Sequence, residues 1–372
     1  MASCIYTGPS GLCAGTAPLS GEHYLPRGLG KFRGYEELIG KVCRDCNERF
    51  SKLDEILLSH GPEALLRLAH GIQGRKKHRR RDLSHDRSHG LPPIEVTALL
   101  PNESAPSRME ILSRNRAQPR RELTFVSAET ESVVVTVPHR VKTRAELQGH
   151  LRKAGVAGRK WAEMRVGGPA EDRDFFALIE QHFGKIQQSG NPPDYSAYPA
   201  GVRAVASIRL PPEYHRAIAK IGFHFFVQRF SPPLTGFEAG FDHIKRLIYE
   251  GGEQRLYVTT AVASLDRTRN PRPPWTHVLC AGWIKDEMFA TVQLFAGSDL
   301  GMQFIAGSDD RATFSGNMSN KSLEWRVRLG RTALAYPWGR RFDFVGYNKR
   351  RDGFDGEVQE FAWTGASWAE KR

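Results

Sequence analysis

Two short stretches decide how this chain begins to fold: residues 20–30, SGEHYLPRGLG, and residues 40–50, GKVCRDCNERF. The first places an acid next to a histidine, and the second carries two cysteines separated by two residues and followed by an asparagine. A pair of thiolates at that separation fits one edge of a tetrahedral zinc site. The order of the two stretches therefore predicts a small module organised around a metal ion.

The cysteines are few and clustered. Four of the five lie in the first 46 residues, and these are Cys4, Cys13, Cys43 and Cys46. Five cysteines are too few for a disulfide scaffold, so their clustering favours a structural Zn²⁺, with Cys4 and Cys13 supplying its second edge. Cys280 stands alone in an apolar run, where we expect a buried and inert thiol.

Patterning divides the chain into four segments. Residues 1–74 form the cysteine-bearing module, with helices expected at 46–59 and 62–69. Residues 75–92 are basic and rich in His, Ser and Gly, which predicts a flexible linker. Residues 93–190 are predicted to be a β-rich domain, with its clearest strands at 122–127 and 132–137 and helices at 144–154 and 174–185.

Residues 191–372 are predicted to form an α+β domain of unknown role. A strand at 204–210 precedes two helices, 212–227 and 237–249. Further strands are expected at 255–263, 277–283, 288–295 and 304–306. The predicted fold class is therefore α+β, with a mainly antiparallel sheet in the larger region.

Length and composition exclude several classes of protein. A chain of 372 residues exceeds what one core usually organises, and 40% hydrophobic residues with 20 Phe and 7 Trp exclude general disorder. The chain has no apolar run long enough to span a membrane and no signal-peptide pattern, which predicts a cytoplasmic protein without a membrane partner. The net charge of +13 favours a polyanionic partner such as nucleic acid.

The N-terminal pattern resembles the HNH, or ββα-metal, endonucleases, in which an acid-His pair ends the first strand of a hairpin and CxxC leads into a helix. It is most similar to a subgroup written EHxxPxxLGG followed by VCxxCNxxxxxxxD. Over residues 4 to 72, the matching residues are Glu22, His23, Pro26, Cys43, Cys46, Asn47 and Asp54.

The resemblance implies an Mg²⁺-dependent phosphodiester hydrolase acting on double-stranded DNA. His23 would be the general base, since an unperturbed pKa of about 6.5 leaves an imidazole basic at pH 7. Glu22 and Asn47 would complete the catalytic site as ligands of Mg²⁺ or another divalent cation, and Asp54 would add a third ligand.

This chain departs from the subgroup at three places. The first CxxC appears as residues 4–7, CIYT, so either Cys13 replaces the cysteine missing at Thr7 or zinc is absent. The asparagine that often lies nine residues before the last ligand falls at Leu38, so the contact that orients His23 comes from elsewhere, such as a backbone carbonyl. The paired glycines appear as Gly30 and Lys31.

Basic residues near this module are candidate phosphate contacts. On the expected helix these are Arg44, Arg49 and Lys52, for which ordinary solvated charges are the alternative. In the linker they are Arg75, Lys76, Lys77, Arg79, Arg80 and Arg81. This run is either an arm that tracks phosphates with salt-sensitive affinity or a solvated linker.

Two functions from different classes stay open. The first is the endonuclease, in which residues 93–372 supply targeting, regulation, or contacts to a second copy or an accessory protein. The second is a non-catalytic, zinc-stabilised nucleic-acid-binding protein. The presence of Glu22, His23 and Asn47 together favours the first, because binding alone requires none of them.

Overall fold

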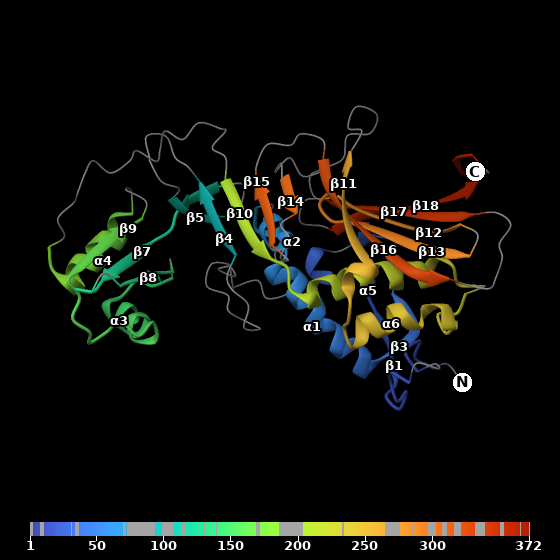
Figure 1. Cartoon of the computed structure of the whole chain (residues 1–372), viewed down its shortest axis with the longest axis horizontal. Coiled ribbons are helices and arrows are strands. Elements are labelled where there is room, and N and C mark those ends of the chain that lie inside the picture. Colours follow the sequence, from blue (N-terminus) through green and yellow to red (C-terminus); the bar gives the residue numbers. More distant parts are fainter. Residues whose placement is uncertain are drawn as a thin grey trace.

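The computed structural model has an α+β fold with a large antiparallel sheet (Figure 1). It describes residues 3–7, 11–30, 32–33, 37–69, 72, 94–98, 107–112, 116–129, 131–138, 140–168, 172–185, 204–232, 234–264, 276–284, 286–296, 303–306, 311–315, 321–331, 339–349, 353–364 and 366–371. The predicted fold class is confirmed at this level.

The N-terminal segment folds as two strands and a helix. Strands β1 (Leu19–Glu22) and β3 (Leu38–Cys43) pair antiparallel, and α1 (Arg44–His60) follows β3 directly. Buried residues recur along α1 at helical spacing, which gives the helix one apolar face. The predicted helix at 46–59 lies within α1, and the one predicted at 62–69 coincides with α2 (Pro62–Ala69).

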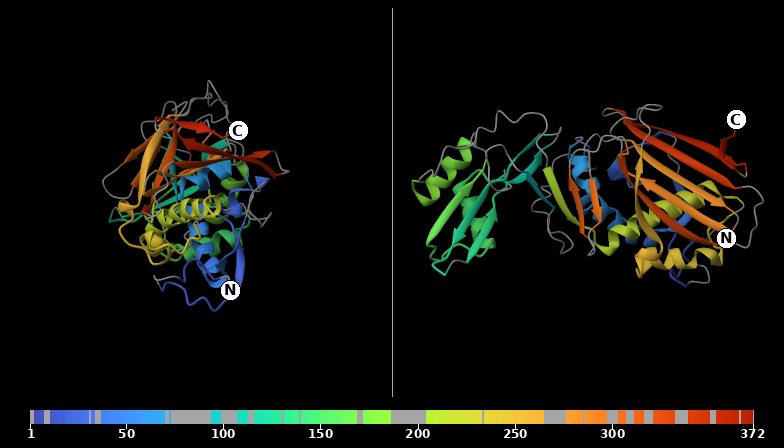
Figure 2. Two further views of the ribbon diagram at one scale, coloured as in Figure 1. Left: turned by 90° about the vertical axis from the view of Figure 1, so that its right-hand side faces the viewer. Right: turned by 45° about the horizontal axis from the view of Figure 1, so that its top comes forward.

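The largest sheet contains eight strands, and α5 (Pro212–Arg229) and α6 (Asp242–Tyr249) lie against it (Figures 1 and 2). Gly222 allows the close approach of α5, because a Cβ at that position would lie 3.0 Å from the Cβ of Ala290. In sheet order the strands are β11 (Val258–Ser264), β16 (Lys321–Arg331), β13 (Glu287–Gln293), β12 (His277–Ile284), β17 (Arg340–Lys349), β18 (Gly353–Trp363) and β19 (Trp368–Glu370). The short strand β2 (Phe32–Arg33) pairs parallel with β18, while the other pairings are antiparallel.

A six-stranded sheet combines strands from distant parts of the chain. Its order is β14 (Gln303–Ala306), β15 (Arg311–Ser315), β10 (Ala204–Arg209), β4 (Glu95–Ala98), β5 (Ser107–Leu112) and β6 (Arg116–Pro119). Pairing of β10 with β4 joins segments from both sides of the boundary that the sequence places at residue 190. Strands β4, β5 and β6 therefore share a sheet with β10, β14 and β15.

A separate small core lies at the left end of the molecule in Figure 1. The three-stranded sheet β8 (Ser132–Thr136), β7 (Glu122–Val126) and β9 (Glu163–Gly167) packs with α3 (Arg144–Lys153) and α4 (Arg173–Phe183). A capping box formed by Thr143 and Glu146 begins α3. Asp172 caps α4 and accepts two hydrogen bonds from buried Arg121. The two helices agree with the sequence prediction.

The N-terminal segment and the region around α5 share one continuous hydrophobic core. Tyr24, which follows β1, packs against Phe225 of α5 with ring centroids 5.3 Å apart and against Phe344 of β17 at 5.9 Å. Tyr6 packs similarly against Phe50 of α1 and Phe223 of α5. The position of α5 relative to β1 and α1 is thus fixed by packing. Within the described residues, no helix is long and apolar enough to cross a membrane.

Candidate functional site

Four cysteines converge at the N-terminal end of α1. Cys4 and Cys13 precede β1, Cys43 ends β3, and Cys46 lies in the first turn of α1. Their sulfur atoms all lie within 4.8 Å of one another, with Cys4 and Cys46 3.8 Å apart and Cys13 and Cys43 3.4 Å apart. Tetrahedral Zn²⁺ with bonds of about 2.3 Å requires sulfur atoms about 3.8 Å apart. The four thiols could therefore hold a metal ion such as zinc, with Cys13 in place of the cysteine missing at Thr7.

The thiols in this cluster differ in acidity. The hydrogen bond between Cys4 and Cys46 lowers the pKa of Cys4 to about 5, whereas burial raises the pKa of Cys43 to about 11. Protons would therefore have to leave the cluster when a metal binds, which makes metal affinity dependent on pH. The remaining cysteine, Cys280, is buried in β12, and burial raises the pKa of its thiol, in agreement with an inert side chain.

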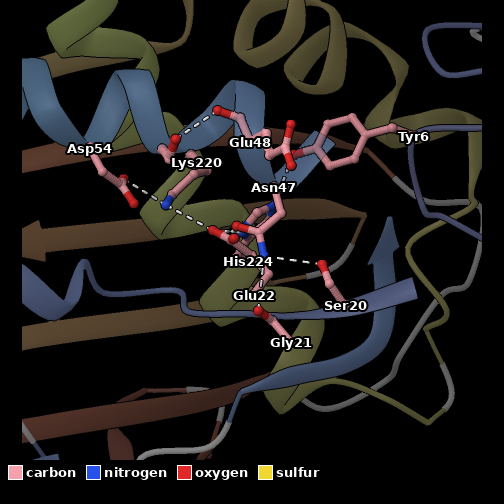
Figure 3. Close-up of polar contacts among 10 residues, drawn as sticks. Tyr6, Ser20, Gly21, Glu22, Asn47, Glu48, Asp54, Lys220 and His224 are labelled. Atoms are coloured by element: carbon pink, nitrogen blue, oxygen red, sulfur yellow. Dashed lines mark hydrogen bonds and ion pairs between the residues drawn. The ribbon is translucent and has the colours of Figure 1, made fainter. Parts of the chain in front are cut away.

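The Glu22 carboxylate at the end of β1 contacts an ammonium group from a distant helix. Glu22 is only 3% exposed, and its Oε1 accepts a hydrogen bond of 2.9 Å from Nζ of Lys220 on α5. The same Nζ donates to Oδ1 of Asp54 at 2.7 Å (Figure 3). Because a fully buried ammonium fills the gap between the two carboxylates, Glu22 and Asp54 do not fit as joint ligands of one Mg²⁺ ion in that gap.

Two carboxylates, those of Glu22 and Asp54, share the single ammonium group of Lys220. Burial raises the pKa of Glu22 to about 7, although Lys220 opposes the shift, and burial also raises the pKa of Asp54. The pKa of Lys220 is raised because the two carboxylates outweigh the effect of its burial. One ammonium thus compensates one carboxylate, and the second carboxylate binds a proton more readily.

Asn47, in the first turn of α1, ties the helix to β1. Its Nδ2 donates to the carbonyl oxygen of Gly21 at 2.9 Å and to Oγ of Ser20 at 3.1 Å. Figure 3 shows the Asn47 side chain on the side of the Glu22 carboxylate away from Lys220. A carboxylate and an amide oxygen are both ligand types that suit a hard divalent cation.

His23 follows β1 directly and contacts a carboxylate. Its Nε2 lies 3.2 Å from Oε1 of Glu37, and Nη2 of half-exposed Arg27 donates to the same oxygen at 2.8 Å. Glu37 immediately precedes Leu38 in the chain. The Glu37 carboxylate thus contacts Nε2 of His23, and a backbone-carbonyl contact to the ring stays a prediction. Such a carboxylate stabilises a protonated imidazole.

A second histidine closes another side of Glu22. His224 lies one turn after Lys220 on α5, and its Nδ1 is 3.7 Å from Glu22 Oε1. The hydroxyl group of Tyr6 lies 2.9 Å from His224 Nε2. Burial, and then the charge of Lys220, lower the pKa of His224 well below its ordinary value. The His224 ring is therefore neutral where it contacts the site.

The basic residues predicted to contact phosphates differ in what else their side chains contact. Arg44 and Lys52 are exposed on α1. The guanidinium of Arg49 instead lies 4.2 Å from the centroid of the Tyr249 ring, and its Nε donates to the Tyr249 carbonyl, which ties α1 to α6. The basic run at residues 75–81 lies outside the described residues.

Several side chains around the site escaped the sequence analysis, namely Arg27, Glu37, Lys220 and His224. The sequence does contain one signal for the last two. A lysine and a histidine four residues apart interrupt the run AIAKIGFHFFV at residues 217–227, and buried lysines generally have a charged partner. That run does not indicate which distant acid is the partner.

Comparison of the chain with protein-family models, with curated proteins and with solved structures gave no match.

Proposed function

We propose that this chain is a metal-dependent endonuclease that hydrolyses phosphodiester bonds in DNA, with His23 as the general base. The observation that supports this function most strongly is that Asn47, in the first turn of α1, is bonded to the end of β1, the strand that carries Glu22 and is followed by His23. Asn47 is bonded to the residue that precedes Glu22, so the end of β1 and the start of α1 form one rigid corner. The same residues carry the resemblance to the HNH endonucleases.

The side chains at this corner have complementary roles in hydrolysis. His23 accepts the proton of the attacking water, and Glu37 stabilises the resulting imidazolium at the 3.2 Å contact. Glu22 and Asn47 would hold the divalent cation, which would supply positive charge for the phosphate and the leaving oxygen. Arg27, half-exposed beside Glu37, and exposed Arg44 would bind flanking phosphates.

The cysteine cluster supports this corner from the opposite side. Cys46 immediately precedes Asn47, so zinc bound to the four cysteines would fix the first turn of α1 and with it the metal-binding amide. Loss of zinc would then disturb both the fold and catalysis.

One observation favours the alternative, a non-catalytic nucleic-acid-binding protein stabilised by zinc. The Glu22 carboxylate is almost fully buried and already bonded to Lys220, as a structural ion pair would be. This alternative leads to DNA binding that weakens with salt and shows no turnover.

Nicking of supercoiled plasmid by the full chain distinguishes the two functions. The assay uses zinc-loaded protein with Mg²⁺, with Mn²⁺ or with a chelator, and compares the wild type with His23→Ala. We expect metal-dependent nicking by the wild type and a loss of about 100-fold or more in His23→Ala, with DNA binding retained. His243→Ala, at an exposed position on α6, is the matched control. Equal cleavage by His23→Ala, or none by the metal-supplied wild type, would exclude the proposed function.

A further inference from the structure

The gap between Glu22 and Asp54 has the chemistry of a divalent cation site, but it contains a lysine. Two carboxylates converge on one point from β1 and α1, and each lies within 3 Å of the same nitrogen atom. Hard oxygen ligands in this arrangement bind Mg²⁺ or Mn²⁺ when the space between them is open. Lys220 reaches this point from α5, 198 residues away from Glu22 in the chain.

The other sides of the Glu22 carboxylate have different neighbours. On one side, neutral His224 lies 3.7 Å from Oε1 and is itself bonded to Tyr6. On the side away from Lys220, Figure 3 shows the amide of Asn47. With Glu22, Asp54 and Lys220 all ionised, the group carries a net charge of −1, which still attracts a divalent cation.

Given the hydrolase function above, we propose that Lys220 is a positioning residue that fills the gap between Glu22 and Asp54 and so directs the divalent cation to the Asn47 side of Glu22. Asp54 is then the counterion of Lys220 and does not bind the cation. The ammonium also holds the Glu22 carboxylate in one orientation.

This role has a consequence that a purely structural ion pair lacks. Removal of the ammonium opens the gap and changes the charge of the group from −1 to −2, so a cation should bind there more tightly. A cation held between Glu22 and Asp54 is displaced from Asn47, so catalysis should fall. Lys220→Met, which keeps the length of the side chain and removes its charge, is therefore expected to raise metal affinity while it lowers the cleavage rate.

Electron paramagnetic resonance of Mn²⁺ measures the affinity without any need for activity. We would titrate Mn²⁺ into full-length, zinc-loaded wild type and Lys220→Met and count the free ion from its six-line spectrum. We expect at least fivefold tighter binding in Lys220→Met, together with at least a tenfold fall in the single-turnover nicking rate at saturating Mn²⁺. Lys245→Met is the matched control, since Lys245 is also fully buried and its nearest described acid, Asp242, is 4.0 Å away.

Asp54→Asn provides a second test that does not depend on the folding of Lys220→Met. If Asp54 is only the counterion, this variant keeps Mn²⁺ binding within about tenfold of the wild type and continues to nick DNA. Glu63→Gln is its matched control, because Glu63 is another buried carboxyl group that is bonded to α5, through Tyr214.

The outcomes separate this inference from the proposed function. Wild-type protein that neither binds Mn²⁺ nor nicks DNA would overturn both. If the wild type nicks DNA and depends on His23, an unchanged or weaker Mn²⁺ affinity in Lys220→Met would overturn the role of Lys220 alone. Loss of Mn²⁺ binding in Asp54→Asn would make Asp54 a ligand and would also overturn it.

Discussion

Glu63, the second residue of α2, is a carboxyl group whose titration should be visible in the stability of the protein. It is 3% exposed, and its Oε1 accepts a hydrogen bond of 2.8 Å from the hydroxyl group of Tyr214. Its Oε2 is buried and accepts no hydrogen bond from the described residues. Burial raises the pKa of Glu63 from 4.5 to about 7.

The sign of the effect follows from linkage. Between pH 4.5 and about 7 the folded state holds a proton on Glu63 that the unfolded state has released, so stability falls as pH rises through this window. A shift from 4.5 to about 7, at about 1.4 kcal/mol per pH unit, makes the full loss about 3 kcal/mol above pH 7. Glu63→Gln keeps an oxygen for Tyr214 and has no proton to lose.

Urea unfolding of zinc-loaded wild type and Glu63→Gln at pH 5, 6, 7 and 8 tests this expectation. We expect similar stabilities at pH 5 and a more stable variant at pH 8, by up to about 3 kcal/mol. Glu48→Gln, at an exposed position on α1, controls for the loss of one acid. A stability difference between the wild type and Glu63→Gln that stays constant from pH 5 to pH 8 would refute the reasoning.

Three other changes test separate parts of the fold. Cys46→Ser should release the metal and lower the melting temperature by more than about 5 °C. Cys280→Ser, outside the cluster, should retain the metal. Metal analysis and calorimetry measure the two effects. Asn47→Ala should lower the free energy of unfolding in urea by about 1–3 kcal/mol, because Ser20 and Gly21 each lose a hydrogen-bond donor. An unchanged urea midpoint would contradict the tie between α1 and β1. Gly222→Leu should lower the free energy of unfolding by about 2 kcal/mol or more, because the leucine side chain would press on Ala290 and Val327. A variant as stable as the wild type would show that α5 can move away from the sheet.

Local patterning predicted much of the secondary structure correctly. The helices at 62–69 and 144–154 and the strand at 204–210 agree with α2, α3 and β10 to within a residue or two. The helix expected at 237–249 begins later, at Asp242, because a 3-10 turn at Ala239–Phe241 precedes it. These elements have capping residues or apolar periodicity that act within a few turns of chain.

The strands after residue 306 were missed, although at least one of them has a visible signal. In β16 the buried residues Trp325, Val327 and Leu329 alternate with exposed Arg326 and Arg328, which is the two-residue period of a strand with one covered face. The pairing of β10 with β4 was also beyond local patterning, since it depends on contacts between segments about 110 residues apart.

For the candidate site, the sequence predicted that the four cysteines of the N-terminal segment come together, but not the surroundings of Glu22 and His23. Convergence of the four cysteines followed from their number and spacing. Lys220 could not be assigned to Glu22, because an ion pair between residues 198 apart is set by how α5 packs on α1. Similarly, the carboxylate of Glu37 reaches His23 only because the β1–β3 pairing brings the two together.

The ion pair of Lys220 with Glu22 can form only late in synthesis, because Lys220 lies 198 residues after Glu22 in the chain. At translation rates of about 5–20 residues per second, α5 leaves the ribosome about 10–40 s after β1. Until then Glu22 and Asp54 have no ammonium between them, and Tyr24 lacks its packing partners on α5 and β17. A nascent chain that has produced only the cysteine-bearing segment thus has every residue of the N-terminal motif but neither the ion pair of Glu22 with Lys220 nor the packing of Tyr24 on α5 and β17.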